Sequence, residues 1–270
     1  MFFFGKKGKA DWEKTKIKGL VYDQNSTSPE FNKLIRTHRF SFDSSGVYRL
    51  PWRMIRDGYR FPAHGEVKED GDLPWGDAVA PGKYKLVLAT DDKQAKRLDS
   101  AIVTVNATGQ YVFSEIDYWQ KRRWDDTLAA AVGRANRAFE ALKEAEKMIA
   151  KVTSANYTSD SINAELKKLQ QPLLDSISTL KLLYMLPEGY RFYEDATIRL
   201  NDHLGAAAGF LGGNDSVTEN VLVSIRNAQR QTDRVLARVN AFFAKQYTPF
   251  VNLANSKQKD LKQIQLPNAF

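Results

Sequence analysis

Five residues with binding chemistry fall in a turn-rich stretch between predicted strands: Arg56, Tyr59, Arg60, Phe61 and Trp75. Aromatic side chains in such a loop either clamp the loop onto a sheet or stack against a ligand such as a sugar ring. Arginines beside them can hold a polar or anionic group. We therefore take these five residues as a candidate ligand-binding set.

A second group lies further along the chain, where Arg226, Arg230, Arg234 and Arg238 recur at every fourth position. On a helix this spacing aligns the four side chains along one slowly drifting line, which we call the arginine ridge. Like charges at that spacing repel by about 0.2–0.5 kcal/mol per pair, so an opposing charge is expected. We favour carboxylates of a neighbouring helix. A polyanion, an acidic partner or lipid headgroups are the functional alternatives.

No catalytic or metal-binding pattern accompanies these residues. The histidines His38, His64 and His203 have no second histidine or carboxylate at a metal-ligand spacing, and the chain has no cysteine. No phosphate-binding glycine loop or nucleophile elbow occurs. We expect a protein that is not an enzyme and has no metal and no cofactor. Carboxylates that converge between the two halves of the chain would make it an enzyme, which is a third alternative.

The composition is that of a folded protein with a thinly spread positive charge. The net charge is +8, and residues 1–108 hold 19 Lys and Arg against 14 Asp and Glu, while residues 109–270 hold 21 against 18. This even spread argues against nucleic-acid binding. No apolar run is long enough to span a membrane. The opening "MFFFGKKGK" places its charges after its apolar residues, so we expect no signal peptide in this chain.

The hydrophobic period changes near Gly109. Before it, apolar residues alternate with a period of two, and turn residues separate the runs. The predicted strands are "KIKGLVYD", "HRFSF", "VYRLPW", "GKYKLVLAT" and "LDSAIVTVN". In the third of these, Tyr48, Leu50 and Trp52 are expected to face the core. Several short strands without an intervening helix favour a β-sandwich.

After Ser114 the apolar residues follow helical spacing. This predicts three long amphipathic helices and a short one, with a kink or a helix restart at Pro172 and an end or bend at Pro249. Such helices bury their apolar stripes against one another, which favours an antiparallel bundle. The expected fold class is α+β with two segregated domains, a β-sandwich over residues 1–110 and a helical bundle over residues 111–270.

Several short motifs resemble a known family. The pattern "SSGVYRLPWRM", followed by "GDAVAPGKYKLVL", is similar to the immunoglobulin-like domain of flagellar hook-capping proteins and its relatives on bacterial surface proteins. The runs "LYMLPEGY", "IRLNDHLGAAAGFLGG" and "VLARVNAFFAKQYTPFVNLA" resemble the C-terminal region of bacterial sortilin-like β-propeller proteins, often labelled BNR-repeat glycosyl hydrolases. The resemblance runs from about Phe2 through nearly the whole chain. Arg53 stands where the sandwich motif usually has Asp.

The resemblance implies a non-catalytic accessory or docking module of an exported protein or cell-surface assembly. The hydrolase label belongs to a propeller that this chain does not contain, so no activity is carried over. The implied partners are another protein or the propeller of a parent protein, at the cell surface or in the periplasm. A carbohydrate-binding module that uses the loop aromatics is the alternative, with a glycan as its partner.

Overall fold

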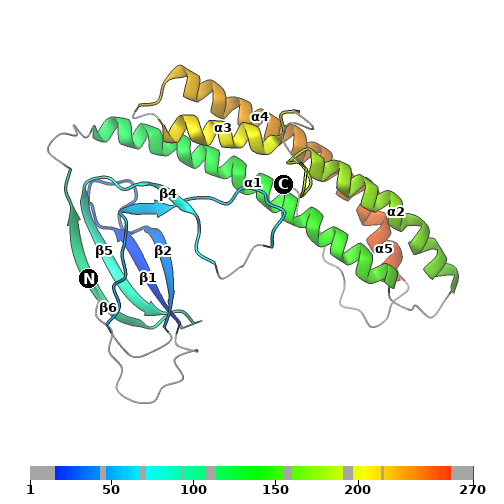
Figure 1. Ribbon diagram of the computed structural model, residues 1–270, viewed down its shortest axis with the longest axis horizontal. Coiled ribbons are helices and arrows are strands. Elements are labelled where there is room, and N and C mark those ends of the chain that lie inside the picture. Colours follow the sequence, from blue (N-terminus) through cyan, green and yellow to red (C-terminus); the bar gives the residue numbers. More distant parts are fainter. Residues whose placement is uncertain are drawn as a thin grey trace, which may run out of the picture. The chain divides into compact units, whose positions relative to one another are not determined.

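The computed structural model describes residues 16–42, 47–66, 71–92, 94–107, 114–154, 160–190, 197–213, 216–256 and 270. The fold is mixed α+β, with helices and antiparallel sheets (Figure 1). The chain divides into two compact units. Residues 1–59 and 67–119 form the sheet unit, and residues 60–66 and 120–270 form the helical unit. The predicted change of period at Gly109 and the first strand expected near Phe2 lie outside the described residues.

The sheet unit contains a four-stranded antiparallel sheet in the order β2-β1-β5-β6. Its strands are β1 (Lys16–Asp23), β2 (Leu34–Ser41), β5 (Gly82–Thr90) and β6 (Arg97–Val105). A two-stranded sheet pairs β3 (Ile55–Asp57) with β4 (Trp75–Ala78). The strands predicted at "KIKGLVYD", "HRFSF", "GKYKLVLAT" and "LDSAIVTVN" are thereby confirmed.

The strand predicted at "VYRLPW" is wrong. Residues 47–53 are extended but belong to no strand, and Pro51 within them has no backbone N–H to donate to a ladder. The predicted alternation of side chains is nevertheless confirmed. Tyr48 and Leu50 pack against the cluster around Leu88, and Trp52 packs against the cluster around Tyr84. The alternation of apolar residues therefore shows that this segment packs on a sheet, although it is not a hydrogen-bonded strand.

Two carboxylates bind backbone N–H groups of the edge strand β2. The Thr37 N–H donates to Asp57 Oδ2 at 3.1 Å, and the Arg39 N–H donates to Asp72 Oδ1 at 3.0 Å. Exposed N–H groups on an edge strand invite pairing with a strand of another chain. Asp57 and Asp72 therefore protect this edge of the sheet.

The helical unit contains most of α1 (Glu115–Ser154), followed by α2 (Asp160–Leu182), α3 (Leu200–Gly212), α4 (Glu219–Phe242) and α5 (Thr248–Ser256). These bounds confirm the predicted three long helices and one short helix, and they add α5. The ion pair between Lys181 and Glu146 joins α2 to α1, and Arg134 Nη1 lies 2.9 Å from Asp233 Oδ1, which joins α1 to α4. Among the described helices, none combines the length and apolar character needed to cross a membrane.

The two prolines that were expected to interrupt helices act differently. Pro172 lies inside a continuous α2, so the helix does not restart there. Pro249 follows a π-helical turn (Phe243–Tyr247) and is the second residue of α5. A proline is tolerated in the first turn of a helix because its missing N–H would have no partner there. The predicted end or bend at Pro249 therefore takes the form of a π-turn followed by a new helix.

Candidate binding cleft of the sheet unit

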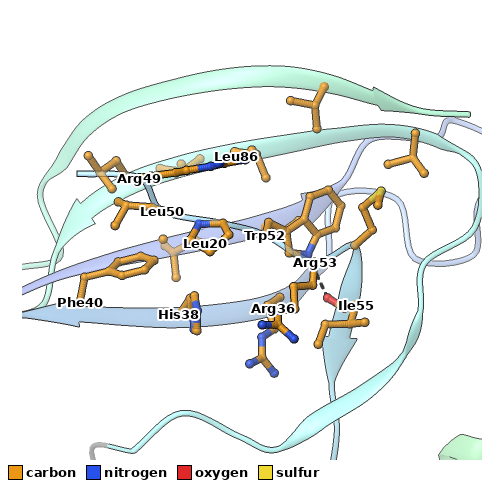
Figure 2. Close-up of a pocket in the computed structure, with 18 of the residues that line it drawn as sticks. Leu20, Arg36, His38, Phe40, Arg49, Leu50, Trp52, Arg53, Ile55 and Leu86 are labelled. Carbon is orange, nitrogen blue, oxygen red and sulfur yellow. Dashed lines mark hydrogen bonds between the residues drawn. The ribbon is translucent and has the colours of Figure 1, made fainter. Parts of the chain in front are cut away.

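A cleft of about 570 Å³ lies between the four-stranded sheet and the segment that crosses it after β2 (Figure 2). Every residue that lines it belongs to the sheet unit. The lining is largely apolar, and it contains no acidic residue in the part of the chain that the structure describes. Figure 2 labels ten of the lining side chains: Leu20, Arg36, His38, Phe40, Arg49, Leu50, Trp52, Arg53, Ile55 and Leu86.

The crossing segment is anchored by its inward side chains. The ring of Trp52 meets that of Tyr84 edge to face, with 5.3 Å between centroids, and Tyr48 meets Phe42 in the same way at 4.5 Å. Pairs of this kind contribute about 0.5–1.5 kcal/mol beyond the area they bury. The alternation that turns these rings inward leaves Arg49 and Arg53 exposed.

A tight reversal after Trp52 returns the chain into β3. Met54 has φ 58°, a left-handed conformation that costs a residue with a Cβ about 1–2 kcal/mol. Trp52 Nε1 donates to the Ile55 carbonyl at 2.9 Å, and the Val79 N–H donates to the Met54 carbonyl at 2.9 Å. These two hydrogen bonds hold the strained residue between the core tryptophan and the end of β4.

The reversal places Arg53 over the ring of Trp75, with 4.5 Å from the guanidinium carbon to the ring centroid. Trp75 is 62% exposed, and it pairs with Asp57 across the β3–β4 ladder. The ladder closes tightly beside it. A Cβ on Gly58 would lie 2.8 Å from the Trp75 carbonyl oxygen, and a Cβ on Gly76 would lie 2.7 Å from that of Asp57. Glycine at both positions is what allows the two backbones to approach so closely.

The basic side chains around the cleft fall into two classes. Arg36 is buried, and its Nη1 lies 2.8 Å from Asp57 Oδ1, while His38 Nδ1 lies 2.7 Å from Asp72 Oδ2. Arg49 and Arg53 are exposed, and no carboxylate among the described residues forms an ion pair with either. The inner basic side chains are therefore matched by carboxylates, and Arg49 and Arg53 give the mouth of the cleft a positive charge.

Asp57 has a structural task. Burial raises the pKa of its carboxyl group, and the Thr37 N–H and the Arg36 guanidinium oppose that rise. Arg36 Nη1 also donates to the carbonyls of Leu73 and Pro74, at 3.2 and 3.0 Å. This arrangement ties β2, β3 and the residues before β4 together around one carboxylate.

Arg56, one of the five predicted ligand-binding residues, is buried in a bidentate pair with Glu30. Its Nη1 and Nη2 lie 2.5 and 2.8 Å from the two carboxylate oxygens. Burial lowers the pKa of Arg56, but Glu30 and the Tyr118 hydroxyl raise it more, so the net pKa is raised. The structure therefore uses Arg56 to hold the interior of the sheet unit together.

The other predicted residues are distributed over both units. Tyr59 is half-buried in the sheet unit, whereas Arg60 and Phe61 belong to the helical unit and are also half-buried. Within the helical unit, hydrogen bonds to α1, to α3 and to the segment that follows α2 hold the residues 60–66. These bonds are Asn201 Nδ2 to the Pro62 carbonyl at 2.8 Å, His64 Nε2 to the Leu186 carbonyl at 2.6 Å, and Lys143 Nζ to the Gly65 carbonyl at 2.7 Å.

Trp75 is the predicted residue that lines the cleft, and the structure does not bring the other four to it. The prediction missed Arg49 and Arg53. A usable signal was present, because both alternate with Leu50 and Trp52, which were assigned to the core. Residues of the opposite phase in that run must point outward.

The arginine ridge lies along the exposed side of α4. Arg226 Nη1 is 3.3 Å from Glu219 Oε1 of the same helix. For Arg230, Arg234 and Arg238, the described part of the chain supplies no carboxylate at ion-pair distance. The acids of a neighbouring helix, the explanation favoured from the sequence, are therefore not found beside these three side chains in the residues that the structure describes.

Comparisons with known proteins add no family assignment. No protein-family model, curated protein or solved structure matches the chain. Within the described residues, no group of three or more histidine or acidic side chains could hold a metal ion.

Proposed function

We propose that this chain is a non-catalytic accessory module of an exported bacterial protein or cell-surface assembly. In this proposal the sheet unit is an immunoglobulin-like sandwich, and the helical unit is an antiparallel bundle. The support comes from the order of the sequence motifs and from the antiparallel sheets and long amphipathic helices that occur in the same order.

The proposal assigns docking to the cleft of the sheet unit. The observation that carries it is the pair of Arg53 and Trp75 at the mouth of an apolar cleft. An exposed tryptophan beside an arginine is a typical anchor of protein interfaces. A partner segment that fits would place an apolar side chain in the cleft and an acidic group near Arg49 and Arg53.

The carboxylates near this cleft support binding over catalysis. Asp57 holds Arg36 and the Thr37 N–H, and Asp72 holds His38 and the Arg39 N–H. Each of them is therefore already engaged in maintaining the sheet unit. A carboxylate committed in this way is poorly suited to exchange protons with a substrate.

Selection of a displayed random peptide library against the full chain tests the docking function. We expect the selected peptides to combine an apolar residue with Asp or Glu. Trp75→Ala and Arg53→Gln should each weaken their binding at least about tenfold, which corresponds to about 1.4 kcal/mol. Tyr190→Ala is the matched control, since Tyr190 is an aromatic residue 61% exposed in the helical unit. Equal binding by the wild type and Trp75→Ala would contradict the proposal.

Glycan binding is the second candidate, and the exposed indole of Trp75 favours it because such rings stack on sugars. A glycan array probed with the wild type and with Trp75→Ala separates the two candidates. Binding of a neutral glycan that Trp75→Ala abolishes, without selection of acidic peptides, would establish the glycan alternative and remove the peptide-docking proposal.

A further inference from the structure

A second cleft, of about 570 Å³, lies in the helical unit beside the C-terminal half of the arginine ridge. Its walls come from the end of α2, the start of α3 and one side of α4. Two ridge residues, Arg234 and Arg238, line it together with Arg199 and His203. Among the described residues that line it, none is acidic. The described part of the cleft therefore gathers basic and polar side chains.

The corner between α2 and α3 is fixed by backbone hydrogen bonds. The N–H groups of Leu200 and Asn201 donate to the carbonyls of Leu183 and Tyr184, at 3.0 and 3.1 Å. The first N–H groups of α3 thus pair with carbonyls that follow the end of α2. Both kinds of group normally lack a partner within their own helix. This junction makes one wall of the cleft rigid.

Arg199 is oriented by the same corner. Its Nε donates to the Leu182 carbonyl at 3.0 Å, and its Nη1 donates to the Thr197 carbonyl at 2.7 Å. These two hydrogen bonds fix the position of the guanidinium. Arg199 is therefore a held part of the cleft wall.

His203 adds a hydrogen-bonding ring to the cleft. Asn227 Nδ2 lies 3.1 Å from His203 Nδ1, and with the amide donating, Nδ1 accepts. Asn227 therefore engages Nδ1, and Nε2 is the ring nitrogen that a ligand can reach.

Two apolar side chains that line the cleft are open to solvent. Ile198 is 68% exposed and Leu182 is 39% exposed. Exposed aliphatic side chains next to the guanidinium groups of Arg234 and Arg238 complement a molecule that has an apolar body and an anionic end.

We propose that this cleft binds a small anionic amphiphile, a phosphate or carboxylate attached to an apolar chain. Arg234 and Arg238 hold the oxyanion, with His203 as a further hydrogen-bonding group. Ile198 and Leu182 cover the first part of the chain. Arginine suits this function because its planar guanidinium donates two parallel hydrogen bonds to such an anion. The proposal does not depend on the docking function of the sheet unit, which lies in the other cleft.

Calorimetric titration of the full chain with dodecyl phosphate below its micelle concentration tests this site. We expect saturable binding with one site per chain. Arg234→Gln/Arg238→Gln should weaken it at least tenfold, and Ile198→Asp, which retains both arginines, should do the same. Arg226→Gln is the control, since Arg226 lies on the same ridge, is equally exposed to solvent and does not line the cleft. It should change the affinity less than twofold.

Three further probes identify what the cleft recognises. Inorganic phosphate should bind at least tenfold more weakly than dodecyl phosphate, and neutral dodecyl maltoside should show no saturable binding. If the cleft binds single molecules, vesicles with anionic lipids should bind the wild type and Arg234→Gln/Arg238→Gln equally well, because no bilayer surface enters the cleft. Equal loss of dodecyl phosphate binding in Arg226→Gln, equally tight binding of the neutral detergent, or wild-type binding only to vesicles would overturn the proposal.

Discussion

The two buried arginines of the sheet unit, Arg36 and Arg56, are each matched by a carboxylate. The Arg56 and Glu30 side chains are only 7% and 11% exposed, so water cannot replace either partner. Loss of one partner would leave the other charged and buried, which is far more costly than losing a surface pair. The stability of the sheet unit should therefore be sensitive to this pair.

Glu30→Gln should lower the free energy of unfolding by about 3 kcal/mol, because Arg56 then remains buried without its counter-charge. Urea denaturation followed by circular dichroism measures this change. Glu219→Gln is the matched control, since Glu219 is 71% exposed and pairs with Arg226 on the surface. Its effect should stay below about 1 kcal/mol. Equal effects of the two substitutions would show that the Arg56–Glu30 pair is not a stabilising interior contact.

Residue types alone could not separate the binding residues from the structural ones. Arg56 and Arg53 lie three positions apart in the same arginine-rich run, yet one is buried and the other is exposed. The difference arises because the chain reverses at Met54, whose left-handed backbone conformation has no signature in its side chain. The candidate site was therefore predicted only in part, through Trp75.

Among the elements, the π-helical turn between α4 and α5 departs from regular helical geometry. Thr248 Oγ1 donates to the Phe243 carbonyl at 2.8 Å across this turn. Aromatic side chains pack around it, with Phe243 and Tyr247 edge to face at 5.4 Å. The turn lets the chain pass from one regular helix into another that begins next to Pro249.

Tyr247, the last residue of this turn, predicts a stability change at high pH. Burial raises the pKa of its phenol to about 12, and Glu144 adds to the rise. The unfolded chain loses this proton near pH 10, so the contribution of Tyr247 is complete below about pH 10 and is lost as the pH rises towards 12. Over this range, the melting temperature of the wild type should therefore fall relative to that of Tyr247→Phe. A difference that does not change with pH would contradict the burial of this phenol.

The regular elements were largely predictable because their patterns are local. The alternation of apolar and polar residues predicted β5 at its observed bounds, and the stripes of apolar residues at helical spacing predicted α1 and α4. The short strands β3 and β4 were missed, since three and four residues are too few to establish a period. The residues 47–53 were assigned to a strand because an extended segment that packs on a sheet has the same alternation as a strand within one.

At the scale of the whole molecule, the chain does not divide into its two units at a single point. Residues 60–66 lie within the sequence of the sheet unit but are part of the helical unit. Lys143 Nζ binds the carbonyls of Ala63 and Gly65 in this segment, and Asn201 binds that of Pro62. Hydrogen bonds between residues so distant in sequence could not be inferred from periodicity, which is a local property.

Lys143→Met should lower the free energy of unfolding of the helical unit by about 1 kcal/mol, because two carbonyls of the segment 60–66 lose their donor. Lys147→Met is the control. Lys147 pairs with Glu66, but the two side chains are 67% and 82% exposed, so its loss should change little. Urea denaturation monitored by the helical signal compares the two. A larger effect of Lys147→Met would show that these carbonyl contacts do not hold the segment.

In our proposal, the cleft at Trp75 and Arg53 is the docking surface of the module. An NMR titration of the full chain with a peptide selected from the displayed library tests this assignment through the indole N–H signals of the five tryptophans. We expect the signals of Trp75 and Trp52 to shift with the added peptide while that of Trp124 in α1 stays in place. Shifts confined to Trp124, with the signals of Trp75 and Trp52 unchanged, would contradict it.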